Sequence, residues 1–201
     1  MIATVPHRAA GALLIVHLAV AAMWLVLVCY WLVSASKAKP NVTRQRYYGL
    51  PLRVALIALI IVLLRSPQLR LWLRQARAVL MPHGSVALIG LALCALGLGL
   101  AMAARIQLGR NWGMPMSQKV EPQLVTGGPY AYARHPIYGG LMLGMLGSAL
   151  SDDLFWALPL LLFTPYFIVS ALREEKLMLE QFPAEYEEYR SRTKLLIPFV
   201  I

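Results

Sequence analysis

The sequence predicts an all-α polytopic membrane protein with about five transmembrane helices, of which the last two form a helical hairpin. Apolar residues make up 59% of the 201 residues, whereas about 45–50% is usual in soluble globular proteins. Only 14% of the residues are charged, and several stretches carry no charge over about 20 residues, the length that crosses a bilayer core of about 30 Å. This composition excludes a soluble single domain and a disordered chain.

The first predicted span covers residues 11–33, which contain no Lys, Arg, Asp or Glu and a single histidine, His17. A cleaved signal peptide is the alternative, but the apolar stretch is longer than the usual core of about 7–15 residues. The second segment, 47–64, is short and carries Arg53 near its start. Residues 84–104 form a clear third span without any charge.

Between the second and third spans, residues 66–81 alternate arginines with apolar side chains, which predicts an interfacial amphipathic helix. The net charge of +10 lies mostly in short segments between spans, a pattern of membrane topology rather than of nucleic-acid binding. Five spans and the positive-inside rule place the C-terminus in the cytoplasm. If residues 47–64 do not cross, the N-terminus changes side and the C-terminal half keeps its orientation.

The fourth and fifth spans, residues 137–150 and 154–172, are separated by the short segment 151–153, which predicts the tight hairpin. Gly140 and Gly144 form a GxxxG pair, which lets two helix backbones approach closely, and we expect it to pack against the fifth span. Cys29 and Cys94 both lie in apolar segments without CxxC spacing, so neither a disulfide nor a metal site is predicted.

Polar residues outside the spans gather in residues 105–136, where prolines and glycines exclude a long helix. Aromatic residues here favour an ordered loop, and anchoring of their rings at the membrane interface is the alternative. His135 precedes Pro136, a favoured first residue of a helix. Helix starts attract carboxylates and phosphates; a plain capping role is the alternative, because nothing near His135 supplies further metal ligands.

The tail from residue 173 onward is the second polar region. Glu174 and Glu175 directly follow the fifth span, where a carboxylate is costly unless it is paired or solvated. A solvated extension of the helix is the alternative. Pro183 predicts a new helix, in which Tyr186 and Tyr189 share an apolar face. We therefore expect the tail to fold back onto the membrane domain.

The segment LVTGGPYAYARHPIYGG, the hairpin after it, and then REEKLMLEQFPAEYEEYRSRTKLLIPF resemble the isoprenylcysteine carboxyl methyltransferase family, including its bacterial members and phospholipid methyltransferase relatives. The resemblance covers about residues 105–201 and rests on GPY, RHPxYxG, EE, FxxEYxxY and IPF in this order. The first 80 residues add only compatible membrane helices, so residues 1–83 are expected to hold the N-terminal membrane helices and the amphipathic segment. The resemblance implies a methyltransferase-like core in 84–201, with a cofactor loop at 105–136 and a cytosolic tail at 173–201.

The resemblance further implies methyl transfer from S-adenosylmethionine, held in a cytosolic cofactor pocket, to a lipidic, lipid-linked or small apolar acceptor. Carboxyl O-methylation is the family's reaction. The implied setting is the bacterial inner membrane, with the cofactor loop and the C-terminus cytoplasmic, and no nucleic acid or metal. The residues implied as cofactor contacts are Gln118, Leu124, Val125, Tyr130, His135, Pro136, Ile137, Tyr138 and Glu174. The residues implied at the acceptor head group are Asn111, Trp112 and Arg173.

Individual roles follow from the same resemblance. Amides at His135 and Pro136 are expected to hold the methionyl carboxylate, and Glu174 to accept bonds from the ribose or the ammonium group. In animal members an arginine four residues before the counterpart of Glu174 binds the substrate carboxylate. Here that position is Ser170, and Arg173 is the expected substitute. Glu175 lies about 100° further round the helix, and it is expected to tolerate a change to Gln if it faces water or the tail.

Two other functions remain open from the sequence. An NADPH-dependent membrane reductase of the sterol type has a similar architecture, and it predicts a cluster of Arg and Lys around the loop to bind phosphate. A membrane scaffold or small transporter predicts no cofactor binding. Motifs of phosphate-binding loops, nucleophile elbows and HExxH zinc sites are absent from the sequence.

Overall fold

The computed structural model describes residues 7–36, 50–80, 84–112 and 123–196. Helices dominate the described residues, and no β-strand is present among them. The predicted all-α class is therefore confirmed. The helices are α1 (His7–Ala35), α2 (Leu50–Arg65), α3 (Pro67–Leu80), α4 (Gly84–Leu108), α5 (Pro136–Ser151), α6 (Ala157–Gln181) and α7 (Pro183–Arg192). The described residues also contain three short 3₁₀ turns: η1 (Gly109–Asn111), η2 (Gly128–Ala131) and η3 (Leu154–Trp156).

Length and apolar composition identify the membrane spans among the described residues. Three helical segments are long and apolar enough to cross: Leu14–Ala35, Gly84–Asn111 and Leu154–Gln181. The pair α2 and α3 qualifies when taken together, although it bends by 80° at the break between them. The structure therefore supports three spans, or four with the bent pair. The predicted count of five is not reproduced, because the 16 residues of α2 and of α5 extend about 24 Å, less than a bilayer core.

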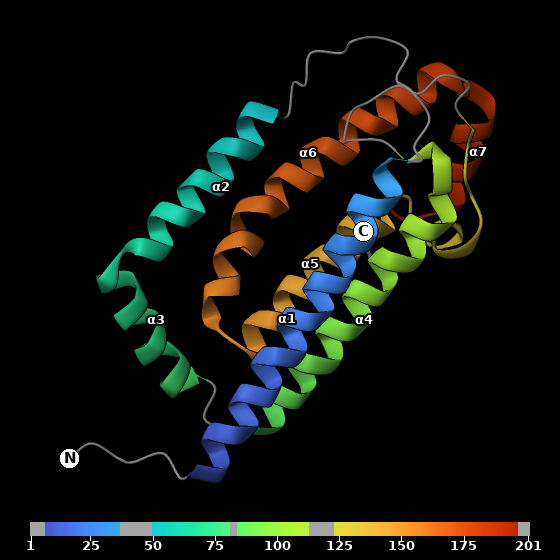
Figure 1. The fold of residues 1–201 in the computed structure, drawn as a ribbon. Coiled ribbons are helices and arrows are strands. Elements are labelled where there is room, and N and C mark those ends of the chain that lie inside the picture. Colours follow the sequence, from blue (N-terminus) through green and yellow to red (C-terminus); the bar gives the residue numbers. More distant parts are fainter. Residues whose placement is uncertain (1–6, 37–49, 81–83, 113–122, 197–201) are drawn as a thin grey trace.

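Helices α1, α4 and α5 lie side by side, and α6 returns along the other side of α5 (Figure 1). Gly140, Gly144 and Gly147 of α5 pack against α4, and not against the following helix as the GxxxG pair suggested. A Cβ atom placed on Gly140 would lie 2.6 Å from the carbonyl oxygen of Gly97, and one on Gly147 would lie 2.2 Å from the amide nitrogen of Cys94. The sequence-based partner was wrong because α4 also presents small residues on one face, which brings the two backbones together.

Gly97→Ala is expected to destabilise the protein by about 1–3 kcal/mol, the usual cost of overpacking. Its Cβ atom would lie 2.4 Å from the backbone nitrogen of Gly144, so the two helices must separate. Gly99→Ala is the matched control, because its Cβ atom would meet nothing within 4 Å. Thermal unfolding in detergent micelles measures both variants, and equal losses would contradict the packing described here.

The hairpin between α5 and α6 is as tight as predicted, and it also holds α1. The Asp153 carboxylate accepts a bond from the Phe155 amide at 3.0 Å and so caps η3. Asp152 lies 2.5 Å from Nδ1 of His17 on α1 and accepts from the Trp156 indole at 3.3 Å. The carboxylate of Asp152 therefore gives the imidazole of His17 a polar partner at this end of the bundle.

The tail folds back onto the start of α5, as predicted. Helix α6 continues beyond the predicted end at residue 172, and α7 begins at Pro183. After α7 the chain pairs with the segment before α5, where the amide of Arg134 donates to the carbonyl of Lys194 at 2.8 Å. Tyr186 and Tyr189 of α7 are both buried. The IPF motif at residues 197–199 lies outside the described residues.

Candidate functional site

A cavity of about 590 Å³ lies where α4 ends and α5 begins. Its wall includes described residues from α1, α2, α4, α5, α6 and α7, and from the loop between α4 and α5. It therefore lies at the end of the bundle opposite the hairpin that links α5 to α6. Apolar and aromatic side chains form most of the wall, with a few polar groups among them. This combination is typical of small-molecule sites.

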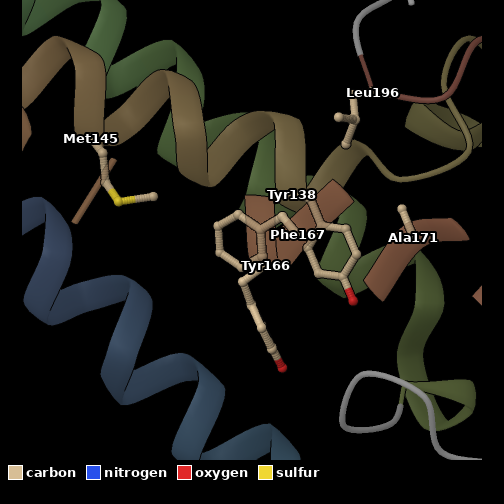
Figure 2. Packing of buried hydrophobic residues seen from close by; sticks show 6 residues of the cluster. All are labelled: Tyr138, Met145, Tyr166, Phe167, Ala171 and Leu196. Carbon is tan, nitrogen blue, oxygen red and sulfur yellow. The ribbon is translucent and has the colours of Figure 1, made fainter. Parts of the chain in front are cut away.

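Three stacked rings run along one side of the cavity. The imidazole of His135 stacks on Tyr138 with centroids 5.6 Å apart, and Tyr138 stacks on Phe167 at 5.0 Å. Tyr166, on the preceding residue of α6, lies 5.8 Å from Phe167. Figure 2 shows the Tyr138, Phe167 and Tyr166 rings together, with the two hydroxyl groups directed away from Met145. The stack joins the start of α5 to the middle of α6.

Glu174 contacts the two members of this stack that carry polar groups, Tyr138 and His135. Its carboxylate accepts a hydrogen bond from the Tyr138 hydroxyl at 2.6 Å, and its second oxygen lies 3.5 Å from Nδ1 of His135. The Glu174 side chain is 25% exposed and lines the cavity. Tyr138 and His135 therefore fix the position of a carboxylate that faces the cavity.

Glu175 is turned away from the cavity and toward the tail. Its carboxylate lies 2.5 Å from Nε of Arg134 and 3.7 Å from Nε of Arg190. Arg134 also donates to the backbone carbonyl of Thr193 at 2.5 Å. The side chains of Glu175 and Arg134 are 7% and 10% exposed. Glu175 therefore faces the tail, where the 100° turn per residue places it in a buried ion pair rather than in water.

A tyrosine of the tail is hydrogen-bonded to the loop that lines the cavity. The Tyr189 hydroxyl donates to the carbonyl of Tyr130 at 2.7 Å. Burial raises the pKa of Tyr189 to about 12, although the nearby Arg134 lowers it in part. Burial also raises the pKa of Tyr130 well above that of a solvated phenol. Both phenols therefore keep their protons and remain hydrogen-bond donors at neutral pH.

Several polar atoms of the cavity wall are buried without a hydrogen-bond partner among the described residues. They are Nε2 of His135, Oδ1 of Asn111 and Oε1 of Gln181. Nε2 of His135 lies 3.9 Å from the Glu175 carboxylate, too far for a hydrogen bond. Unpartnered buried polar atoms are rare in folded proteins. Their presence in one wall indicates a site for a polar ligand.

The structure brings most of the predicted site residues together in this wall. Those that line the cavity are Asn111, Trp112, Leu124, Val125, Tyr130, His135, Ile137, Tyr138 and Glu174. Pro136 is buried at the start of α5 and is not part of the wall, and Arg173 is exposed on α6, also outside it. Gln118 lies outside the described residues.

The amides of His135 and Pro136, at the start of α5, do not form the expected site for a carboxylate. The amide of His135 already donates to the carbonyl of Leu195 at 2.9 Å, and Pro136 has no amide hydrogen to donate. These two residues therefore supply no backbone donor to a ligand. The first amides of α5 that carry a hydrogen belong to Ile137 and Tyr138.

Reasoning from the sequence missed Arg53, which reaches the cavity from α2. Its Nε donates to the hydroxyl of Tyr166 on α6, and its guanidinium carbon lies 5.5 Å from the centre of that ring. The sequence did contain one signal, a charged residue near the start of an otherwise apolar segment. A charged side chain inside a membrane costs free energy, and such side chains are often functional. It did not identify the partner, which is 113 residues away along the chain.

Comparisons with known proteins match the part of the chain that contains α4, α5 and α6. A family model described as phospholipid methyltransferase matches residues 86–185. Protein-S-isoprenylcysteine O-methyltransferase of Schizosaccharomyces pombe is 31% identical over 109 residues, which cover 52% of this chain and 46% of that protein. The cobalt-zinc-cadmium resistance protein CzcN of Cupriavidus metallidurans is 33% identical over 106 residues, covering 51% of this chain and 49% of that protein.

A solved structure has the same fold. It is the eukaryotic intramembrane Ras methyltransferase, an isoprenylcysteine carboxyl methyltransferase, with a TM-score of 0.53 and 23% identity. The match covers 79% of this chain and 55% of that one. The chain spans about half the length of the curated relatives that it matches. It is an integral membrane protein, and it belongs to the family of isoprenylcysteine carboxyl methyltransferases and their phospholipid methyltransferase relatives.

Proposed function

We propose that the protein is a membrane methyltransferase that uses S-adenosylmethionine and acts on a lipidic or small apolar acceptor. The observation that carries the proposal is the cavity wall, in which a positioned carboxylate and unpartnered polar atoms stand beside stacked aromatic rings. The family supports transfer of a methyl group. The proposed setting is the bacterial inner membrane, with the cavity and the tail on the cytoplasmic side.

The residues of the wall fit S-adenosylmethionine. Glu174 is a suitable acceptor for an ammonium group or for ribose hydroxyls. Asn111 and Gln181 each have a buried oxygen without a partner among the described residues, which suits a donor such as the adenine amine. Tyr130 and Tyr138 supply rings for an adenine to pack against. The cavity volume of about 590 Å³ is within the usual range of cofactor sites, about 300–1,000 Å³.

The chain's own contribution to the reaction is positioning and exclusion of water. When bound, S-adenosylmethionine supplies a methyl group on a sulfonium, which becomes the neutral thioether S-adenosylhomocysteine once a lone pair of the acceptor has taken that methyl group. Displacement of this kind needs no nucleophilic residue of the protein. Tyr138 and His135 hold Glu174 in place. The Arg134–Glu175 pair holds the tail over the cavity, which keeps water out.

The wall argues against the NADPH-dependent reductase. That function predicts a cluster of basic side chains to bind phosphate. Among the described residues of the wall, the Arg and Lys side chains are Arg53 and Arg134, which lie on different elements. Arg134 is already bonded to Glu175 and to backbone carbonyls of the tail. The described part of the wall therefore contains no cluster of basic side chains that would bind a phosphate group.

The test is transfer of a labelled methyl group. Purified protein in lipid nanodiscs is incubated with methyl-labelled S-adenosylmethionine and a bacterial lipid extract, and label in the organic phase is measured. We expect label transfer by the wild type and a loss of more than about 10-fold in His135→Ala, which corresponds to about 1.4 kcal/mol. His17→Ala, at the opposite end of the bundle, is the control and should keep its rate. Equal losses in the two variants would remove His135 from the site.

A further inference from the structure

A second cavity, of about 420 Å³, lies beside the tail, and we call it the basic pocket. The described residues that line it are Arg134 and residues 190–195, at the end of α7. None of these residues is acidic, and the positively charged ones are Arg134, Arg190, Arg192 and Lys194. Arg134 also lines the proposed cofactor cavity, whereas the other three cations are not in the described wall of that cavity.

Three of the four cations are available to a ligand. Arg134 is not, because its side chain is 10% exposed and already donates to a carboxylate and to backbone carbonyls of the tail. Arg190 and Arg192 each lie 3.7 Å from a glutamate carboxylate, beyond hydrogen-bonding distance, and their side chains are 46% and 60% exposed. Lys194 is exposed and forms no ion pair with any of the described residues.

Cations near the end of a helix often do no more than stabilise its last carbonyl groups. In α7 that role is already filled. Arg134 donates to the carbonyl of Arg190 at 3.3 Å and to that of Thr193 at 2.5 Å, and the Thr193 hydroxyl donates to the carbonyl of Tyr189 at 2.7 Å. The three exposed cations are therefore not required to cap α7.

The backbone that carries these cations is fixed by the segment before α5. The amide of Arg134 donates to the carbonyl of Lys194 at 2.8 Å, and the amide of His135 donates to that of Leu195 at 2.9 Å. Leu196, the next residue, is buried in the core. Cations on an ordered backbone lose less conformational entropy when they bind an anion, and their hydrogen bonds to phosphate oxygens are strong. The basic pocket is therefore suited to a phosphate group.

The surroundings of the basic pocket are typical of the head-group region of a membrane. Tyr132 is 60% exposed, and its carbonyl accepts a hydrogen bond from the Lys194 amide at 3.4 Å. Exposed tyrosine rings and clustered Lys or Arg side chains both occur at the membrane–water interface. Turn η2, directly before Tyr132, packs against α4, where the apolar side chain of Ile106 is 57% exposed. Figure 1 shows α7 at the end of the bundle where α4 ends.

We propose that the basic pocket binds the phosphate group of an anionic phospholipid from the surrounding bilayer. Arg190, Arg192 and Lys194 bind its oxygens, and the ring of Tyr132 lies among the head groups. The bound lipid holds the tail against the membrane surface. The proposal does not depend on the proposed function, because these three cations are not in the described wall of the cofactor cavity.

The test is native mass spectrometry of the full chain in a neutral detergent, which measures how tightly individual lipids bind. The probes are phosphatidylglycerol and phosphatidylcholine with the same acyl chains, which differ in head group and net charge. We expect phosphatidylglycerol to bind about 10-fold or more tightly, because each cation at a membrane surface attracts anionic lipid. Inorganic phosphate and glycerol phosphate, added as competitors, should not displace it. Displacement by either would identify a site for a soluble phosphate compound and overturn the lipid proposal.

Arg192→Gln combined with Lys194→Gln should weaken binding of phosphatidylglycerol by about 10-fold, and Lys194→Gln alone by about 3- to 5-fold. The single variant decides the question if the double variant does not fold. The matched control removes two exposed arginines elsewhere, Arg65→Gln with Arg74→Gln at the end of α2 and on α3, and should keep the preference of the wild type.

The proposal is overturned if the wild type shows no preference for phosphatidylglycerol, if the preference survives in the tail variants, or if the control variant loses as much of it. Binding of S-adenosylhomocysteine to the same samples is measured separately. A wild type that selects phosphatidylglycerol through the tail but binds no S-adenosylhomocysteine would refute the proposed function and leave the lipid site standing.

Discussion

Replacing Glu175 by alanine is expected to destabilise the protein by about 3–5 kcal/mol, the usual cost of removing one partner of a buried ion pair. Arg134 would keep its charge with its side chain 10% exposed, and the carboxylate opposite it would be gone. Arg134 also donates hydrogen bonds to the backbone carbonyls of Arg190 and Thr193. The loss should therefore loosen the tail, and thermal unfolding together with limited proteolysis of the tail would measure it.

An exposed ion pair on α7 provides the control. Arg192 and Glu188 lie 3.7 Å apart, with side chains 60% and 76% exposed. Because solvent screens such a pair, Glu188→Ala should change the melting temperature little. If Glu175→Ala is as stable as Glu188→Ala, then the buried pair does not hold the tail in place.

Glu174→Gln is expected to weaken binding of S-adenosylhomocysteine by about 10- to 150-fold, at about 1.4 kcal/mol per factor of ten. The substitution keeps the shape and an acceptor for the Tyr138 hydroxyl, which lies 2.6 Å from the carboxylate. It removes the charge, and a hydrogen bond to a charged group is worth about 1.5–3 kcal/mol. Calorimetric titration of the folded variant gives the affinity, and its melting temperature should stay close to that of the wild type.

Glu175 is not a suitable control for Glu174→Gln, because it belongs to the buried ion pair with Arg134. Glu180 lies on the same helix and is exposed, so Glu180→Gln should bind S-adenosylhomocysteine as the wild type does. A small and equal effect of Glu174→Gln and Glu180→Gln would mean that the Glu174 carboxylate faces solvent and not a ligand.

Much of the fold was predictable because apolar stretches and the residues that start or end a helix are local features of the sequence. The charge-free stretches predicted α1 and α4, the short segment 151–153 predicted the hairpin, and Pro183 predicted the start of α7. The partner of the α5 glycines was not predictable in the same way. A GxxxG pair indicates a close approach without naming the other helix, and Gly97 on α4 supplies it.

The site was predictable as a set of residues but not as a set of contacts. The motif that contains His135 and Tyr138 follows directly from the resemblance, and these side chains do line one cavity with Glu174. Arg53 was missed because its place depends on how α2 packs against α6, which no local pattern encodes. The role of Glu175 was missed for the same reason, since its partner Arg134 comes from another segment.

Calorimetric titration of the purified protein with S-adenosylhomocysteine, and with NADPH under the same conditions, tests the central claim most directly. The cavity wall predicts saturable binding of S-adenosylhomocysteine with one site per chain, and no binding of NADPH. Binding of NADPH instead, or of neither compound by folded protein, would contradict the assignment of this cavity to a methyltransferase cofactor.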